Sequence, residues 1–288
     1  MGIFYSSNYN QKEKDNELDL AEQIDEEIKF PLYYSKSDTI FDSIKEMNLF
    51  QQITLIEYIN LLSNITLDNS DNIFEGPFKI NFSYYDSQNF INSYMSDELY
   101  NNFINKRILS LRKLDENETI FRDMCIEIYN VLKIKLKEHY KNENAQITKK
   151  DLISLGLFFC KGTNAFKMKL IFDLFKNNKG YLEQNEFLDE FLLCNFLIGS
   201  YILLHANKNL GRTNPLVSQI PSEEIEKYME IYDLNGCENL VKEFNSCFFN
   251  GMKLTFYEYK RNFKDSNGFG WIFFPEGIRQ KLEENKFI

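Results

Sequence analysis

Four short stretches of this chain place a carboxylate four positions after an aliphatic residue and directly before an apolar one. These cassettes are residues 53–58, 147–152, 182–187 and 254–259, and their carboxylates are Glu57, Asp151, Glu186 and Glu258. Carboxylate and carbonyl oxygens are the ligands that Ca²⁺ prefers, and one cation takes about six to eight of them. Each cassette is therefore a candidate source of one calcium ligand where a helix begins.

One cassette alone follows a loop of full calcium-binding length that offers further oxygen ligands. If Asp151 ends a twelve-residue loop beginning at Tyr140, the other ligands are Asn142, Asn144 and the backbone carbonyl of Gln146. Tyr140 stands where the first carboxylate ligand is needed, and an aspartate reaches less far than the usual glutamate. The sequence predicts weak calcium binding in this loop or none, and it predicts no other cofactor.

The other reactive residue types form no catalytic pattern. The chain has two histidines, and its five cysteines include no Cys-x-x-Cys pair. The sequence contains neither a glycine-rich phosphate loop nor a nucleophile elbow. We therefore expect no enzyme activity, and we expect reduced cysteines in a cytosolic protein. A net charge of −10 argues against nucleic acid as a partner.

The amino-terminal residues carry a pattern for lipid attachment. Gly2 and Ser6 stand where N-myristoylation requires them. A single myristoyl chain binds membranes only marginally, and the acidic residues that follow would be repelled by anionic lipid. Gly2 is thus a lipidation candidate, and membrane contact is expected only if it is acylated. Residues 187–204 approach the length of a membrane span, but charged residues interrupt them, so we expect a long buried helix.

A cluster of aromatic residues near the carboxyl end is a candidate partner surface. It contains Trp271, the one tryptophan of the chain, close to Phe273 and Phe274. Two interpretations stay open: the cluster caps the last helix onto the core, or these three residues dock a partner. The general excess of aromatic residues in protein cores favours the cap.

Residues 146–193 carry a series of short motifs typical of one helical superfamily. The motifs are the 147–152 cassette, Lys161-Gly162-Thr163, the apolar run 169–175, Gly180-Tyr181-Leu182 and Glu186-Phe187. This stretch resembles the calcineurin-B and neuronal-calcium-sensor branch of the EF-hand superfamily, and residues 221–263 look like the hand that follows. The resemblance covers about half of the chain and departs from the family at the metal ligands. It implies helical hands whose apolar groove holds a partner's helix.

The expected fold class is all-α, because apolar residues recur at helical spacing along most of the chain. We expect EF-hand-like helix-loop-helix pairs with insertions and minimal two-residue β pairing between loops. The expected regions are a flexible acidic arm (1–36), a helical region with one degenerate EF-hand-like unit and an insertion (37–115), a paired EF-hand-like lobe (116–204), and a degenerate unit with an aromatic tail (205–288).

The pairing within the lobe can be predicted from spacing. Ile147 and Leu182 are 35 positions apart, as expected of equivalent residues in the two loops of one lobe. We therefore predict that Ile147 and Leu182 pair with each other.

Two functions are compatible with these observations. The first is a non-enzymatic EF-hand-like adaptor or structural subunit, independent of calcium, that binds protein partners within a larger assembly. The alternative is a myristoylated calcium sensor whose working loop is 140–151. The expected location is the cytoplasm, and association with a membrane or the cytoskeleton stays open.

Overall fold

The structure is a computed structural model, and it describes residues 33–37, 53–63, 93–104, 118–211, 222–264 and 268–286. Within these ranges the chain is all-α, as predicted, with isolated β-bridges and no β-strand. The elements are α3 (Leu55–Ser63), α5 (Asp97–Asn102), α6 (Glu118–Tyr140), α7 (Lys149–Phe159), α8 (Asn164–Phe175), α9 (Glu186–Leu197), the π-helical turn η3 (Ile198–Ile202), α10 (Leu203–Gly211), α11 (Ser222–Ile231), α12 (Leu234–Phe249), α13 (Phe256–Lys264), the 3₁₀ turn η4 (Phe269–Phe273) and α14 (Pro275–Lys286).

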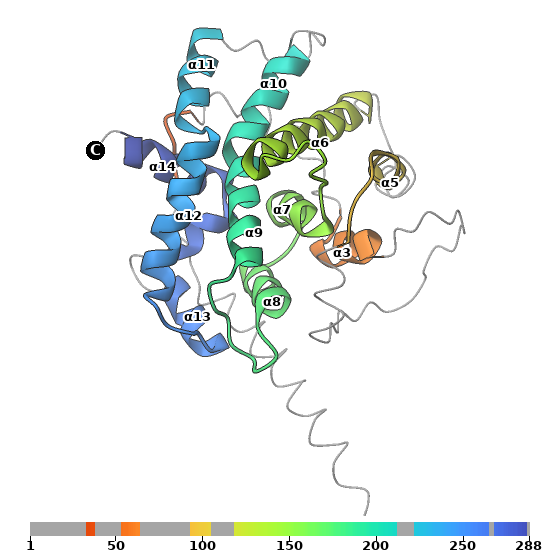
Figure 1. Cartoon of the computed structure of the whole chain (residues 1–288). Helices are drawn as coiled ribbons and strands as arrows, with labels where there is room; N and C mark the ends of the chain where they lie inside the picture. Colours follow the sequence, from red (N-terminus) through yellow and green to blue (C-terminus); the bar gives the residue numbers. More distant parts are fainter. Residues whose placement is uncertain are drawn as a thin grey trace, which may run out of the picture.

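One long helix runs through the middle of the molecule, formed by α9, η3 and α10 in succession (Figure 1). Its residues Glu186–Ala206 are long and apolar enough to cross a membrane, which the sequence did not lead us to expect. However, 83% of the most apolar window is buried inside the protein, as predicted for a core helix. The described residues contain this one candidate span, and helices of protein cores commonly meet the same criterion.

Several helices pack on opposite sides of this central helix. On one side α7 contacts α9 and α6 contacts α10, while on the other α12 contacts α9 and α14 contacts η3 (Figure 1). Gly199 lies close to α14: a Cβ atom there would lie 2.8 Å from Ile278 Cδ1, and that side chain would have to shift. Each neighbouring helix buries an apolar stripe; on α6 it consists of Met124, Ile128, Leu132 and Leu136.

The predicted pairing of Ile147 with Leu182 is wrong. Leu182 instead pairs with Leu254 in an antiparallel bridge, where each backbone N–H donates to the other's carbonyl at 2.9 and 2.8 Å. The bridge joins the third cassette to the fourth. Spacing along the chain does not decide the pairing, because the loop that meets Leu182 is not the neighbouring loop in the sequence.

The second cassette pairs with a segment that the sequence analysis treated as part of an insertion. The N–H of Met95 donates to the Ile147 carbonyl at 2.8 Å, and the N–H of Lys149 donates to the Ser93 carbonyl at 2.9 Å. In the first cassette, Leu55 and Ile53 exchange backbone hydrogen bonds with Lys161. All three pairings, 53–55 with 161, 95 with 147 and 182 with 254, join residues from different predicted regions.

Candidate functional site

The first and fourth cassettes use their carboxylates to start a helix. The N–H and the hydroxyl of Thr54 both donate to Glu57 Oε2 at 2.7 Å, and the Glu57 N–H donates back to the Thr54 hydroxyl at 3.2 Å. Thr255 and Glu258 repeat this arrangement at 2.8, 2.8 and 3.3 Å. This is the capping box, which satisfies backbone donors that a helix start leaves without a partner. The same hydrogen bonds hold the pKa of the Glu258 carboxyl below its usual range.

The second cassette shares this geometry but is buried. The N–H and hydroxyl of Thr148 donate to Asp151 Oδ2 at 2.7 and 2.8 Å, and Asp151 is 3% exposed. Burial raises the pKa of the Asp151 carboxyl, while the nearby ammonium of Lys150 and the bonds from Thr148 act to lower it. Lys150 is itself 3% exposed and forms an ion pair with Glu190 of α9. A cationic side chain of the protein therefore lies beside the carboxylate that was predicted to bind calcium.

The other candidate calcium ligands differ from Asp151 in exposure. Asn142, Asn144 and Gln146 are exposed, whereas Asp151 is buried at the start of α7. The Asn142 side-chain oxygen already accepts the N–H of Asn144 at 2.9 Å. Among the residues that the structure describes, no group of three His, Cys, Asp or Glu side chains could hold a metal ion.

In the loop before the third cassette, a side chain accepts hydrogen bonds from the loop's own backbone N–H groups. Asn177 Oδ1 accepts the N–H groups of Lys179 and Tyr181 at 3.0 and 3.1 Å. Glu186 does not form a capping box, because α9 is capped by Asn185, whose side chain accepts the Leu188 N–H at 3.0 Å. The loop oxygens thus serve the local turn and the helix start.

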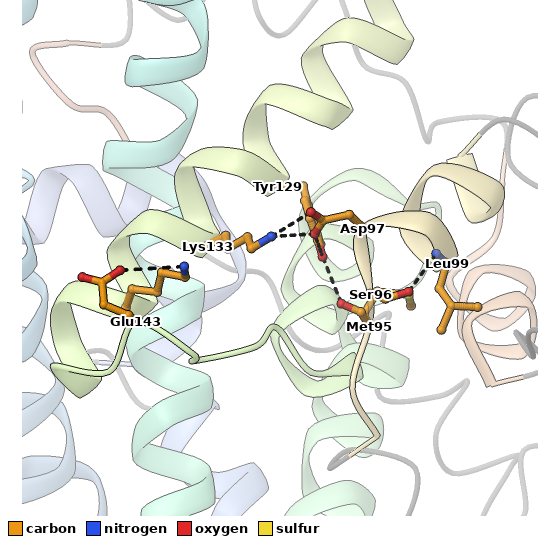
Figure 2. Close-up of polar contacts among 8 residues, drawn as sticks. Met95, Ser96, Asp97, Leu99, Tyr129, Lys133 and Glu143 are labelled. Atoms are coloured by element: carbon orange, nitrogen blue, oxygen red, sulfur yellow. Dashed lines mark hydrogen bonds and ion pairs between the residues drawn. The ribbon is translucent and has the colours of Figure 1, made fainter.

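The segment before α5 is a structural equivalent of the cassettes that sequence reasoning missed. Figure 2 shows Asp97 accepting from Lys133 Nζ at 2.7 and 2.8 Å and from the Tyr129 hydroxyl at 3.0 Å. The Tyr129 hydroxyl also donates to the Met95 carbonyl at 2.9 Å. These contacts from α6 hold the segment beside the second cassette. Ser96 caps α5, as threonines cap the helices of the first and fourth cassettes. The segment has no carboxylate four positions after Met95, because that position is Leu99.

The carboxy-terminal aromatic residues that are candidates for a partner surface mostly lie in the core. Trp271 is 5% exposed and packs on Phe196 and Phe244, with ring centroids 5.4 and 5.7 Å apart. Phe273 is buried as well, and Phe274 is partly buried. The burial agrees with the interpretation in which the cluster caps the last helix, because a side chain inside the core cannot also face a partner.

Two further observations complete the description of the site. Gly2, the lipidation candidate, lies outside the described residues. A scan against protein-family models, a search of curated proteins and a search of solved structures each gave no match to this chain.

Proposed function

We propose that this chain is a non-enzymatic adaptor or structural subunit, built from EF-hand-like helix-loop-helix units, that binds partner proteins without calcium. The observation that carries the proposal is the use of the cassette carboxylates in helix caps. Glu57, Asp151 and Glu258 each accept two hydrogen bonds from a threonine three positions earlier. A calcium ion would have to compete with these bonds, and six to eight oxygen ligands would have to converge on it.

The bridges support the pairing of helix-loop-helix units. The reciprocal bond between Leu182 and Leu254 fits a pair made of α8 with α9 and α12 with α13. The bonds from 93–95 to 147–149 fit a second pair in which α6 and α7 form one unit. Such pairs keep the helical scaffold of a calcium-binding lobe while needing no metal for their packing.

Exposed apolar side chains near the Leu182–Leu254 bridge offer a surface to a protein partner. Tyr257 is 74% exposed, Met252 55% and Tyr181 39%. Exposed apolar groups that gather in one region commonly mark contacts between proteins. We expect Tyr257→Glu to weaken partner capture more than the same substitution at Tyr34, which is also exposed but belongs to another part of the chain.

The proposal is tested by calorimetry together with capture of partners. Titration of the full chain with calcium should give no saturable heat at millimolar cation. The same partner proteins should be recovered from the source tissue or cells with and without a calcium chelator. Loss of every partner upon chelation would overturn the proposed independence from calcium.

The alternative, a myristoylated calcium sensor, is favoured by the exposed Asn142, Asn144 and Gln146 in the loop before α7. It requires Asp151 to leave its buried cap and join those oxygens. A one-site isotherm with micromolar affinity, abolished by Asp151→Ala, would establish this function in place of the adaptor. Intact-mass measurement of the native protein would show whether Gly2 carries the lipid.

A further inference from the structure

Residues 33–37, here called the latch segment, pack on helices at the other end of the chain. Along this segment burial alternates: Tyr33, Ser35 and Ser37 face the protein, while Tyr34 and Lys36 are exposed. Ser35 is 2% exposed and Ser37 is fully buried. This alternation is the pattern of a peptide that lays one face on a binding surface.

The contacts of the latch segment converge on one carboxylate of α14. The Lys36 N–H donates to Glu283 Oε2 at 2.9 Å, and the Ser37 hydroxyl donates to Oε1 at 3.1 Å. The Tyr232 hydroxyl, from the junction of α11 and α12, also donates to Glu283. Glu283 is 5% exposed, so the latch segment supplies two of these three donors to a buried carboxylate. Hydrogen bonds to an ionised group are stronger than those between neutral groups.

Arg279 of α14, which also contacts the latch segment, is bound to the core. The guanidinium of Arg279 donates to the Gly199 carbonyl of η3 at 3.0 Å and reaches the Ser35 hydroxyl at 3.5 Å. Tyr232 is fully buried, and α14 buries Ile278 and Leu282 against the core. Tyr33 of the latch segment also packs on Phe274, with ring centroids 5.7 Å apart. Arg279 and Tyr232 also have contacts outside the latch segment, since Arg279 binds the Gly199 carbonyl and Tyr232 stacks on Tyr228 with ring centroids 5.6 Å apart.

We propose that Glu283, Tyr232 and Arg279 form a peptide-binding site, which the latch segment fills as a releasable ligand within the same chain. The site takes an extended segment that presents two hydroxyl side chains and the backbone N–H between them. Water can replace such polar contacts when the segment leaves, so their net contribution is much smaller than their strength in isolation. This site is separate from the calcium-independent adaptor function, and either proposal can fail alone.

The test uses a substitution that displaces the latch segment from the site in the full-length chain. The same segment is then added as a separate peptide. Ser37→Glu places a carboxylate against Glu283 in a buried position, which should expel the latch segment. The probe is a fluorescently labelled synthetic peptide of residues 30–40, followed by anisotropy. We expect the Ser37→Glu chain to bind this peptide at least tenfold more tightly than the wild-type chain, whose site is already filled.

Two controls identify the binding groups. Adding Glu283→Gln to the Ser37→Glu chain should weaken peptide binding at least tenfold, and so should a peptide with both serines changed to alanine. Ser246→Glu makes the same charge change on an exposed part of α12 and should leave the site closed. A folded Ser37→Glu chain that does not bind the peptide would overturn the proposal.

Hydrogen exchange tests the same idea in the wild-type chain, should Ser37→Glu fail to fold. A releasable segment opens more often than the core, so the Lys36 amide should exchange at least tenfold faster than the Ile278 amide of α14 after correction for intrinsic rates. Equal exchange of the two amides would show that the segment leaves only when the whole fold opens, and the proposal would be abandoned.

Discussion

The buried ion pair between Lys150 of α7 and Glu190 of α9 offers the most direct test of how the second cassette is held. The two side chains are 3% and 19% exposed. In Lys150→Met the substituted side chain keeps a similar length and loses its charge. Glu190 is then left without its cation, close to the buried carboxylate of Asp151. We expect Lys150→Met to lower the free energy of unfolding markedly. A second substitution that removes the Glu190 charge should restore much of that loss.

The size of the effect follows from burial. Removing one partner of a buried ion pair typically costs about 3–5 kcal/mol, because the remaining charge stays buried and uncompensated. Glu190 keeps some contact with solvent, so the lower figure, about 3 kcal/mol, applies to Lys150→Met. A chain of this size should then melt roughly 6–12 °C lower. Lys150→Met with Glu190→Leu removes both charges and should regain at least about 2 kcal/mol of the loss.

The assay is urea unfolding followed by far-UV circular dichroism, with thermal melts in parallel. The matched control is Lys281→Met, because Lys281 forms an exposed pair with Glu284 whose side chains are 37% and 42% exposed. Exposed pairs contribute at most about 1 kcal/mol, so this control should remain close to wild type. The reasoning is refuted if Lys150→Met costs less than 1 kcal/mol, or if the double variant is less stable than Lys150→Met.

Three further predictions concern packing, a buried hydroxyl and pH. Gly277→Ala should cost about 1–3 kcal/mol in urea unfolding, because its Cβ would lie 2.8 Å from the backbone oxygen of Trp271. Tyr58→Phe should cost about 1 kcal/mol by the same measurement, since its buried hydroxyl donates to a backbone carbonyl of α7 at 2.9 Å. Lys133 lowers the pKa of Asp97 from 3.8, so the stability advantage of wild type over Asp97→Asn should be complete above that pH and fade below it.

Each of these three predictions has its own control and its own contrary result. The control for Gly277→Ala is Gly162→Ala, because a Cβ atom at Gly162 would lie 3.4 Å from its nearest neighbour, and it should cost less. If Tyr58→Phe left the melting temperature unchanged, the hydrogen bond of the Tyr58 hydroxyl would make no net contribution to stability. For Asp97, the sign follows because the unfolded carboxyl takes up protons at a higher pH than the folded one. If the stability difference between wild type and Asp97→Asn grew as the pH falls from 5 to 3, Lys133 could not be the cause of the lowered pKa of Asp97.

The sequence predicted the fold class and the helix starts because both depend on local patterns. A threonine followed three positions later by a carboxylate forms a capping box wherever a helix begins, and Thr54, Thr148 and Thr255 all do so. Spacing singled out the four carboxylates, of which Glu57, Asp151 and Glu258 lie in capping boxes and Glu186 does not. Their role in helix capping could have been recognised from that threonine, which calcium coordination does not require.

Tertiary partners could not be read from local patterns in the same way. Leu182 pairs with Leu254 rather than with Ile147, because packing around α9 decides which loops meet. The segment that pairs with Ile147 was missed because Leu99 stands where the other cassettes have a carboxylate. Nothing near residues 33–37 in the sequence indicates their contact with α14, since the partner lies more than 240 positions away.

The separation between Lys36 and Glu283 also sets an order of events during synthesis. Their hydrogen bond spans 247 positions, so it cannot form until at least that many further residues have been translated. At about 5–20 residues per second, this takes roughly 12–50 s, while the intervening helices have time to fold. The nascent amino-terminal segment therefore spends this interval without its own binding site, open to modifying enzymes and chaperones at the ribosome.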